Sequence, residues 1–450
     1  MWLVIIPVLL LFSIILIPAI PKIGGEVRSG LLISGLVAAL LGGLGFTDII
    51  DAAVYGIDML SWVIMLSIFG SIYSETQVKL GTMDTTLNTF RSLFGSSSKG
   101  LIASVILTLI LAGSLLGDAI AAATVIGFLI IGSLRDLKLS GEQVGAIIVM
   151  GAVIGSGMPP ISQAFFLSSS LVGVDPGSVL PMAYITVGLS TVVAIITGFI
   201  IVRNKPLSPD LIPDKSPWQI LKPNVYTFIP LFVLAVIVVA ASVFEYNIFE
   251  EWIIFAAITD YLATIPIVQG ITFRVVTALI AAIAISFIFP KVRKETGSVI
   301  TGGLSKVNKT VQIQLCAGFM VGVFYKAGLI EEVQNYTENL AAGALKLGGG
   351  ISTILVGMLS GSQTTAQTVM LTFLGPVLTN MGDNPINVAT GGALFAMAGQ
   401  SMPPVGLTTF VVAGIVGGMI NAKVDPVKIM IIVLPVSLFF AIAGLFFWFI

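Results

Sequence analysis

Apolar runs close to the length of a membrane-spanning helix recur from one end of the chain to the other. A helix needs about 20 consecutive apolar residues to cross the hydrocarbon core of a bilayer. The first run, residues 1–20, has no basic leading segment and no A-x-A-like cleavage site, so it is predicted to be a retained span rather than a signal peptide. The pattern predicts an all-α polytopic membrane protein.

The composition supports this class and narrows the chemistry. The chain is 56% hydrophobic and 10% charged, and its mean hydropathy is +1.08, whereas an average soluble domain has about 25% charged residues. It contains no histidine and a single cysteine, Cys316. These counts exclude a disulfide within the chain, a cysteine metal cluster and histidine-based acid–base or metal chemistry. We expect the lipid bilayer as its surroundings and no transition metal, organic cofactor or nucleic-acid partner.

Basic residues gather in alternate loops. Cytoplasmic loops of membrane proteins are enriched in Lys and Arg, and with loops assigned to alternating sides only Arg274, Lys326 and Lys346 fall outside the basic side. Arg274 and Lys326 are predicted to be interfacial side chains that extend toward the lipid headgroups. The chain is therefore predicted to be a multi-pass protein of the cell (inner, cytoplasmic) membrane. The opposite, external side collects acidic residues: Asp48, Asp51, Asp58, Glu245, Glu250, Glu251, Glu331, Glu332 and Glu338.

The assignment holds only if two stretches, at about 100–134 and 350–380, each enter and leave the membrane on one side. The first lies between Lys99 and Arg135, so both its ends are cytoplasmic, and the second lies between acidic residues, so both its ends are external. Each is too long for one span and has a polar, Gly-rich centre, GSLLGD in the first and GSQTT in the second. These facts predict two re-entrant helical hairpins whose tips meet at mid-membrane.

The two hairpins belong to an internal repeat. GSLLGDAIAAATVIG (113–127) and GSQTTAQTVMLTFLG (361–375) have the same length and begin with Gly-Ser. Each is followed by Met-Pro-Pro and then Val-Asp-Pro, and FGSIY and VGVFY precede them, so four features recur in order at offsets of 244 to 252 residues. Because the flanking charges lie on opposite sides, the repeat is inverted, which is typical of secondary transporters.

The repeat sets the predicted domain organisation. The first half, 1–202, and the second half, 224–450, are joined by a Pro-rich, basic cytoplasmic linker, 203–223. After its hairpin each half has a broken helix, at about 140–172 and 386–418. The stretch 245–270 has no counterpart in the first half and is predicted to be an external helix or a partial span.

Each broken helix is interrupted by two successive prolines, in GSGMPP (155–160) and QSMPP (400–404). Proline lacks the N–H and clashes with the preceding turn, so the breaks free backbone carbonyls that must be satisfied within the hydrocarbon region. A bound Na⁺ satisfies them, because unwound carbonyls and hydroxyls form an oxygen-rich cage. The hairpin tips complete the cage and expose helix N-termini, whose partial positive charge suits an anionic substrate. A single proline would indicate only a kink, but two breaks paired with two hairpins favour a site.

Asp118 is the only acid placed inside either hairpin. An intramembrane carboxylate is costly enough to indicate a function or a buried partner. We therefore predict a cation ligand or proton carrier, with a structural hydrogen bond as the alternative. The predicted substrate-binding residues are neutral hydrogen-bonding groups near the tips and breaks: Ser162, Gln163, Ser362, Gln363, Thr364, Thr365, Thr408 and Thr409.

The tips and breaks resemble a known family. GDAIAAATVIG (117–127) together with GAVIGSGMPPISQAFFLSSSLVGVDPGSVL (151–180) resembles the large membrane subunit of TRAP transporters, and PPVGLTTFVVAGI (403–415) is close to that family's PPVG signature. The resemblance covers most of the chain, about 69–415, and that family belongs to the ion transporter superfamily. It implies an elevator mechanism, in which two hairpins and two broken helices slide against a scaffold of the remaining helices. It implies cation sites, for Na⁺ (or H⁺), at Gly113, Ser114, Gly117, Asp118, Gly155, Ser156, Gly157 and Pro159, and at Gly361, Gly399, Gln400, Ser401 and Met402.

The chain departs from that family at the first tip, where Gly117-Asp118-Ala119 replaces a Ser-rich Gly-Ser-Ser. This departure puts the coupling ion and its stoichiometry in question. TRAP large subunits also work with a small membrane subunit and a soluble substrate-binding protein. A homodimer that acts alone is the alternative arrangement.

The expected function is ion-coupled uptake of a small organic anion such as a carboxylate, with Na⁺ favoured as the coupling ion. The nearest alternative is a Na⁺/H⁺ antiporter that uses Asp118. A membrane-embedded enzyme is not expected, because it should show clustered acids, His or Cys at the interface. A channel would not need two hairpin gates.

Overall fold

The structure is a computed structural model that describes residues 2–17, 20–203, 205–207, 212, 214–243, 246, 248–328 and 342–450. Every regular element in these ranges is a helix, which confirms the all-α class. Among them, five helices are long and apolar enough to cross a membrane. The number is six if the bent pair α3 (Phe46–Met59) and α4 (Ser61–Leu80), which meet at 53°, counts as one span.

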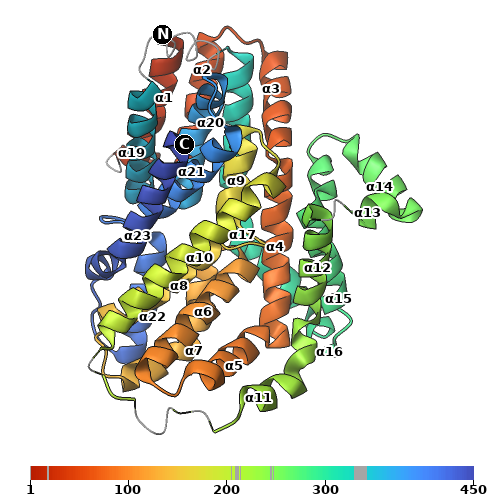
Figure 1. The fold of residues 1–450 in the computed structure, drawn as a ribbon. Helices are drawn as coiled ribbons and strands as arrows, with labels where there is room; N and C mark the ends of the chain where they lie inside the picture. Colours follow the sequence, from red (N-terminus) through yellow and green to blue (C-terminus); the bar gives the residue numbers. More distant parts are fainter. Residues whose placement is uncertain are drawn as a thin grey trace.

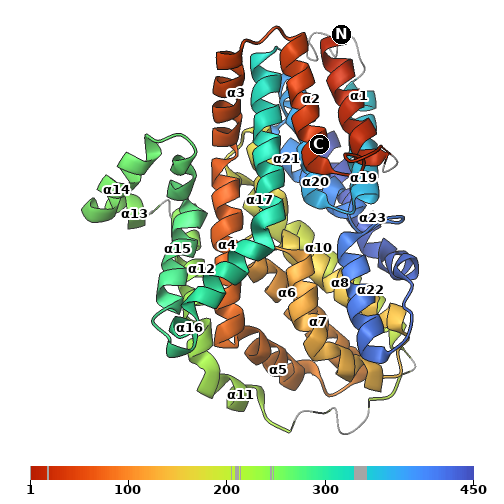
Figure 2. The same cartoon turned by 180° about the vertical axis from the view of Figure 1, so that it is seen from behind.

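One part of the molecule is organised around α17 (Thr296–Lys326), which packs along α2 (Val27–Leu41), α3 and α4 (Figure 2). α1 (Trp2–Leu16) packs on α2, α15 (Arg274–Ser286) on α4, and α12 (Ile229–Val243) on α15. We call these seven helices the α17 unit. Glycines permit its tightest crossing, since a Cβ on Gly56 would lie 1.9 Å from the carbonyl oxygen of Gly318.

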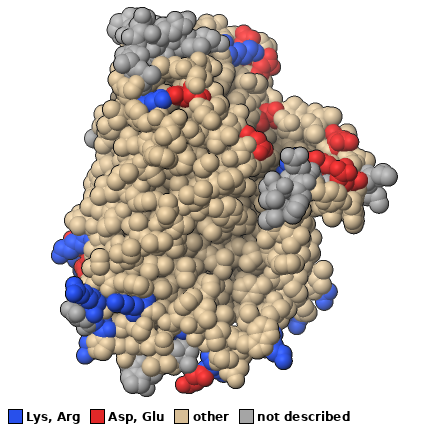
Figure 3. Space-filling model, viewed as in Figure 1, with Lys and Arg blue, Asp and Glu red and all other residues tan. Residues whose placement is uncertain are grey.

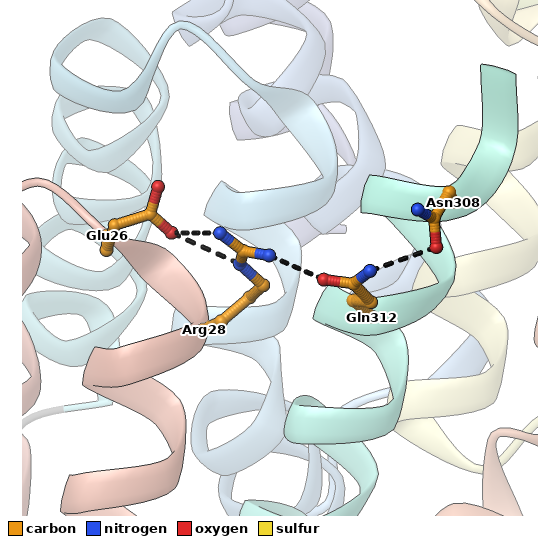
Figure 4. Close-up of polar contacts among 4 residues, drawn as sticks. All are labelled: Glu26, Arg28, Asn308 and Gln312. Atoms are coloured by element: carbon orange, nitrogen blue, oxygen red, sulfur yellow. Dashed lines mark hydrogen bonds and ion pairs between the residues drawn. The ribbon is translucent and has the colours of Figure 1, made fainter. Parts of the chain in front are cut away.

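A chain of four polar residues also joins α2 to α17 (Figure 4). Arg28 donates from Nε and Nη2 to Glu26 Oε2 at 3.1 and 2.8 Å, and from Nη1 to Gln312 Oε1 at 2.5 Å. Gln312 Nε2 in turn donates to Asn308 Oδ1 at 2.9 Å, one helical turn earlier on α17. Because a guanidinium has only donors, these acceptors fix the orientation of Arg28 where α2 begins.

The second part contains two sets of five helices (Figure 1). The first set is α6 (Ser98–Leu116), α7 (Ala119–Asp136), α8 (Gly141–Gly157), α9 (Gln163–Val172) and α10 (Pro176–Ile201). The second set is α19 (Ala342–Ser360), α20 (Gln363–Asn380), α21 (Pro385–Gly399), α22 (Leu407–Ile420) and α23 (Pro426–Phe449).

The two sets are built alike and interlock. Each begins with two helices that pack against each other and against the third, α6 and α7 on α8 in one set, α19 and α20 on α21 in the other. α9 packs on α20 and α21 of the other set, α22 packs on α7 and α8, and α10 packs on α23. We call these ten helices the hairpin unit.

Two short helices connect the two units, and a third joins α15 to α17. α5 (Thr82–Phe94) follows α4 and packs on α6, α11 (Pro217–Asn224) packs on α5, and α16 (Pro290–Arg293) precedes α17. α11 overlaps the end of the predicted linker 203–223, of which residues 204, 208–211 and 213 lie outside the described part of the chain.

The stretch 245–270 forms an arm beside the body of the molecule (Figure 1). Its described elements are α13 (Ile248–Glu251), α14 (Ile253–Ala263) and the 3₁₀ helix η3 (Val268–Thr272); residues 244, 245 and 247 are not described. Asp58 of α3 anchors the arm, because its carboxylate accepts hydrogen bonds from Ile267 N at 2.6 Å and from Gln269 Nε2 at 2.5 Å.

The described charges follow the predicted sidedness, with most blue groups toward the lower end in Figure 3 and most red groups on the upper part and the arm. Each basic residue that broke the pattern pairs with an acid: Arg274 with Glu250 (3.9 Å), Lys326 with Asp48 (3.4 Å) and Asp51 (3.2 Å), and Lys346 with Asp383 (2.6 Å). Ion pairs therefore give Arg274 and Lys326 partners on the acidic side, and their position at the lipid headgroups stays a prediction. Glu245, Glu331, Glu332 and Glu338 lie outside the described residues.

Candidate functional site

Each hairpin turns at a glycine in the left-handed backbone region. Gly117 follows α6 with φ of 65°, and Gly361 follows α19 with φ of 66°, a conformation that costs residues with a Cβ about 1–2 kcal/mol. The next residue caps the second helix: Asp118 Oδ1 accepts from a backbone N–H of α7 at 2.7 Å, and Ser362 Oγ accepts from one of α20 at 3.3 Å. Such oxygens satisfy N–H groups that have no partner within the helix. The two tips therefore have the same construction.

Equivalent positions of the two tips are 244 residues apart. α6 and α7 begin and end at this offset from α19 and α20. The sequence comparison paired Gly113 with Gly361 through their shared Gly-Ser, and this pairing is wrong by one helical turn, because Gly361 has the backbone role of Gly117. Asp118 therefore corresponds to Ser362 of the second tip.

Glycines bring each hairpin against the broken helix of its own half. A Cβ on Gly113 would lie 2.6 Å from the carbonyl carbon of Gly155. At the equivalent crossing, a Cβ on Gly357 would lie 2.9 Å from Cα of Gly399. Since backbone atoms fill these spaces, close helix packing explains why the predicted site residues Gly113, Gly155 and Gly399 are glycine.

The breaks are tied to the tips by hydrogen bonds. α8 ends at Gly157 and α21 at Gly399, and each is followed by a cis bond between two prolines. In the first half, Ser114 Oγ donates to the carbonyl of Pro159 at 2.6 Å. In the second half, Leu407 N donates to the carbonyl of Gly361 at 3.3 Å. A tip and a break thus form one composite element in each half.

A buried chain of hydrogen-bonded side chains, which we call the central chain, joins the two composite elements. Gln400 Nε2 donates to Gln363 Oε1 at 3.0 Å, and Gln363 Nε2 donates to Ser156 Oγ at 3.5 Å. Ser156 is fully buried, and the two glutamines are 7% and 6% exposed. Ser156 and Gln400 are also equivalent positions of the repeat. The chain brings three predicted site residues, from the first break, the second tip and the second break, into one cluster.

The second half also contains buried polar atoms that have no hydrogen-bond partner among the described residues. Burying such an atom unpaired costs about 1–3 kcal/mol, so these atoms call for a partner such as water or a ligand. These atoms belong to Gln367 (Oε1 and Nε2), Thr368, Thr390, Ser401 and Thr409, and also to Gln314 (Oε1) and Ser437. The first-half residues equivalent to the first five of these are mostly apolar: Ala123, Thr124, Ala146, Gly157 and Phe165.

Two oxygens lie beside Gly406 at the second break. A Cβ on Gly406 would lie 3.0 Å from Thr409 Oγ1 and 3.2 Å from the backbone oxygen of Gln400. Gly406 precedes α22 and offers no side-chain cap to it. Carbonyl and hydroxyl oxygens at an unwound helix suit Na⁺, and the described residues contain no group of three or more His, Cys, Asp or Glu that would suit another metal. The second break therefore fits a cation site.

The remaining predicted substrate residues have separate environments. Ser162 caps α9, accepting from Phe165 N at 3.4 Å. Gln163 Nε2 donates to Ser67 Oγ of α4 at 3.0 Å, so its amide contacts the α17 unit and not the central chain. The others are near the second tip and break: Thr364 is partly exposed, and Thr365 and Thr408 are buried, as is the predicted cation-site residue Met402.

Sequence reasoning missed the polar residues of α4 and α17. Glu75 of α4 forms an ion pair with Lys306 of α17, and the Glu75 side chain is only 10% exposed. Ser67 of α4 hydrogen-bonds Gln314 of α17 at 2.9 Å. The signal lay in Ser-Glu-Thr-Gln at 74–77, four successive polar residues that close an otherwise apolar run.

Comparison with known proteins gives a likeness in fold only. No protein-family model matches the chain, and no curated protein matches it. The fold is similar to that of the YdaH transporter of Alcanivorax borkumensis, whose crystal structure is described as revealing an unusual topology. The TM-score is 0.58 at 12% sequence identity, and the match covers 99% of this chain and 95% of that chain.

Proposed function

We propose that this chain is a secondary active transporter that couples the uptake of a small organic anion, such as a carboxylate, to Na⁺. The observation that carries the proposal is the buried chain Ser156–Gln363–Gln400, which joins two equivalent tip–break elements. Ligand sites of transporters with inverted repeats lie between the repeats, at interrupted helices. The likeness to the fold of the YdaH transporter supports membrane transport.

Na⁺ is proposed at the second break, where the unpaired Thr409 hydroxyl and the carbonyl oxygen of Gln400 both lie beside Gly406. The anion is proposed between the central chain and the start of α22. The backbone N–H groups at a helix N-terminus carry partial positive charge, and at α22 no side-chain cap competes for them. The bound Na⁺ supplies further positive charge next to this position.

The proposed movement is an elevator displacement of the hairpin unit against the α17 unit. Each unit is packed extensively within itself, whereas the contacts between them run mainly along α4 with α6 and α9, and along α17 with α20. A boundary confined to a few helices permits one unit to move as a body.

Uptake into proteoliposomes tests the proposal. Carboxylates labelled with ¹⁴C should accumulate when Na⁺ is high outside, and collapsing the gradient should stop accumulation. Thr409→Val should raise the Na⁺ concentration for half-maximal uptake about tenfold, which corresponds to about 1.4 kcal/mol. The control is Thr353→Val, because Thr353 is equally buried but its hydroxyl bonds its own helix at 2.8 Å. Equal Na⁺ dependence in the two variants would remove the second break from the coupling site.

A Na⁺/H⁺ antiporter is the second candidate, favoured by the carboxylate of Asp118 at the first tip. An antiporter would move protons against Na⁺ with no organic solute present, which a pH-sensitive dye inside the vesicles records. Asp118→Asn should abolish that flux while keeping the helix cap, since Asn caps as well as Asp. Proton flux that persists in Asp118→Asn would exclude this use of Asp118.

Two partner arrangements follow from the family resemblance. One is a small membrane subunit together with a soluble binding protein, and the other is a homodimer that acts alone, in both cases in the cytoplasmic membrane. Uptake by the purified chain without added proteins would favour the second, and the mass of the detergent-solubilised particle would give the number of copies.

A further inference from the structure

The hairpin unit touches α4 and the last residue of α3 along one face of α9. Gln163, Phe166 and Ser170 have the spacing of residues that share a helix face. Their partners run in the opposite direction along the chain, so the two helices are antiparallel. The contacts are Gln163 Nε2 to Ser67 Oγ (3.0 Å), the Phe166 ring against the Trp62 ring (6.0 Å between centroids) and Ser170 Oγ to the carbonyl of Met59 (3.1 Å).

Ser67 is where three helices meet. Its hydroxyl accepts from Gln163 of α9 and, at 2.9 Å, from Gln314 Nε2 of α17, and it donates to the carbonyl of Val63 at 3.0 Å. A hydroxyl has one donor and two acceptor positions, so its capacity is filled. Ser67 is 3% exposed and Gln314 is 1% exposed, so the bonds of Ser67 to Gln314 and Val63 are sheltered from competing water, whereas the bond from Gln163 is partly buried.

Only one of these three bonds crosses between the units. Ser67, Val63 and Gln314 belong to the α17 unit and keep their positions when the hairpin unit moves. Gln163 belongs to the hairpin unit, so any displacement of α9 along α4 breaks its bond to Ser67. Ser67 and Gln314 thus form a fixed, prearranged receptor for one amide of the other unit.

α4 offers a second hydroxyl on the same face. Ser74 lies seven residues after Ser67, which is two turns and about 10 Å along the helix, and it is buried. Between them Gly70 faces Ile161 of the first break, with 3.6 Å from an ideal Cβ to its side chain. Ser71 differs, because its hydroxyl donates to the carbonyl of Gly303 within the α17 unit at 2.8 Å.

We propose that Ser67, held by Gln314, is a latch that retains the hairpin unit in the position seen here, and that Ser74 receives Gln163 after α9 has moved two turns along α4. The inference rests on the proposed elevator movement and adds the residues that set its two end positions. Hydrogen-bonding positions one or two turns apart give a sliding helix discrete stops, since intermediate registers leave the amide unpaired.

Distance measurements on the full-length protein in liposomes test the latch. In a Cys316→Ser background, spin labels are attached to Phe46→Cys on α3, which is 79% exposed, and to Lys423→Cys, which is exposed between α22 and α23. The wild-type pair should show two distances. Ser67→Ala should lower the population of the present distance relative to the other about fivefold, the effect of one net hydrogen bond. Ser74→Ala should shift the ratio in the opposite direction.

Ser71→Ala is the matched control, because it removes a hydroxyl from the same helix without touching α9. An unchanged ratio in Ser67→Ala, or an equal shift in Ser71→Ala, would overturn the latch. Should Ser67→Ala fail to fold, Ser74→Ala still tests the proposal. An unchanged ratio of the two distances in Ser74→Ala would overturn it. Uptake assays separate the two proposals. If the distance ratio shifts as expected but Na⁺-coupled uptake is absent, the latch is supported and the proposed function is not. If coupled uptake is present but only a single distance is seen, the proposed function is supported and the latch is not.

Discussion

Asp118 caps α7 through the same backbone geometry that Ser362 uses to cap α20. Serine, asparagine and aspartate are similarly good caps, so the fold does not require a charge at this position. A carboxylate inside a membrane protein is nevertheless costly. The choice of Asp rather than Ser at position 118 therefore needs a reason beyond the cap, and the cation site predicted for the first half would supply one.

Substitutions of Asp118 separate its two roles. Asp118→Ala should lower the free energy of unfolding by about 0.5–2 kcal/mol through loss of the cap, whereas Asp118→Asn should leave it nearly unchanged. Thermal unfolding of the purified variants measures this difference. A loss of stability in Asp118→Asn as large as in Asp118→Ala would mean that the charge itself stabilises the tip.

Gly155 lies where α8 meets the first hairpin, and a Cβ there would lie 2.7 Å from the carbonyl oxygen of Ile110 and 2.9 Å from Cα of Gly113. Backbone atoms cannot rotate away, so Gly155→Ala should destabilise the protein by about 1–3 kcal/mol. Gly188→Ala on α10 is the control, because nothing lies within 4 Å of its Cβ position. The control should be neutral or slightly stabilising. Unfolding temperatures compare the two, and equal values would exclude the packing role.

At the scale of elements, local signals predicted the hairpins and breaks, because Gly and Pro-Pro act on the backbone where they stand. The register of the repeat was not predictable, since both Gly113 and Gly117 are glycine and only the structure shows which one adopts positive φ. Gly-Ser at 113–114 makes a helix crossing and a bond to the break, whereas Gly-Ser at 361–362 makes a turn and a cap. The same Gly-Ser dipeptide thus has different structural roles in the two halves.

Contacts between distant elements left no local signal. Ser67 and Gln314 are 247 residues apart and Ser67 and Gln163 are 96 apart, and each looks like an ordinary polar residue in an apolar run. The central chain was partly predictable, because Ser156, Gln363 and Gln400 flank the breaks and the second tip. Their mutual contact depends on how the two halves interlock, which the sequence does not show.

The ion pair between Glu75 and Lys306 joins α4 to α17, and its two ends differ in exposure. The Glu75 side chain is 10% exposed and that of Lys306 is 50% exposed. Lys306→Gln leaves a buried carboxylate unpaired and should cost about 1–3 kcal/mol, whereas Glu75→Gln leaves an ammonium that water hydrates and should cost less than about 1 kcal/mol. Thermal unfolding of both variants measures the asymmetry. A larger loss of stability in Glu75→Gln than in Lys306→Gln would show that the ammonium of Lys306, and not the carboxylate of Glu75, is the group that needs its partner.

At the scale of the whole molecule, the distribution of charge gives the two ends different surroundings. The acids that pair with Arg274, Lys326 and Lys346 lie on the predicted external side. Ion pairing removes the contradiction between these three residues and the preference of Lys and Arg for cytoplasmic loops. This orientation predicts that the arm of α13 and α14 is external and that α11, at the opposite end of α12, is cytoplasmic.

Cysteine accessibility in intact cells tests this orientation in the Cys316→Ser background. Tyr261→Cys on the arm and Trp218→Cys on α11 are suitable positions, because the native side chains are 68% and 64% exposed. A membrane-impermeant maleimide should label Tyr261→Cys in intact cells and Trp218→Cys only after the membrane is opened, because α12 between them must cross the bilayer. Labelling of both from outside would place α11 and the arm on one side and make α12 a surface helix. Labelling of Trp218→Cys in intact cells and of Tyr261→Cys only after the membrane is opened would show the opposite orientation in the membrane. The side from which the anion enters would then also be the opposite one.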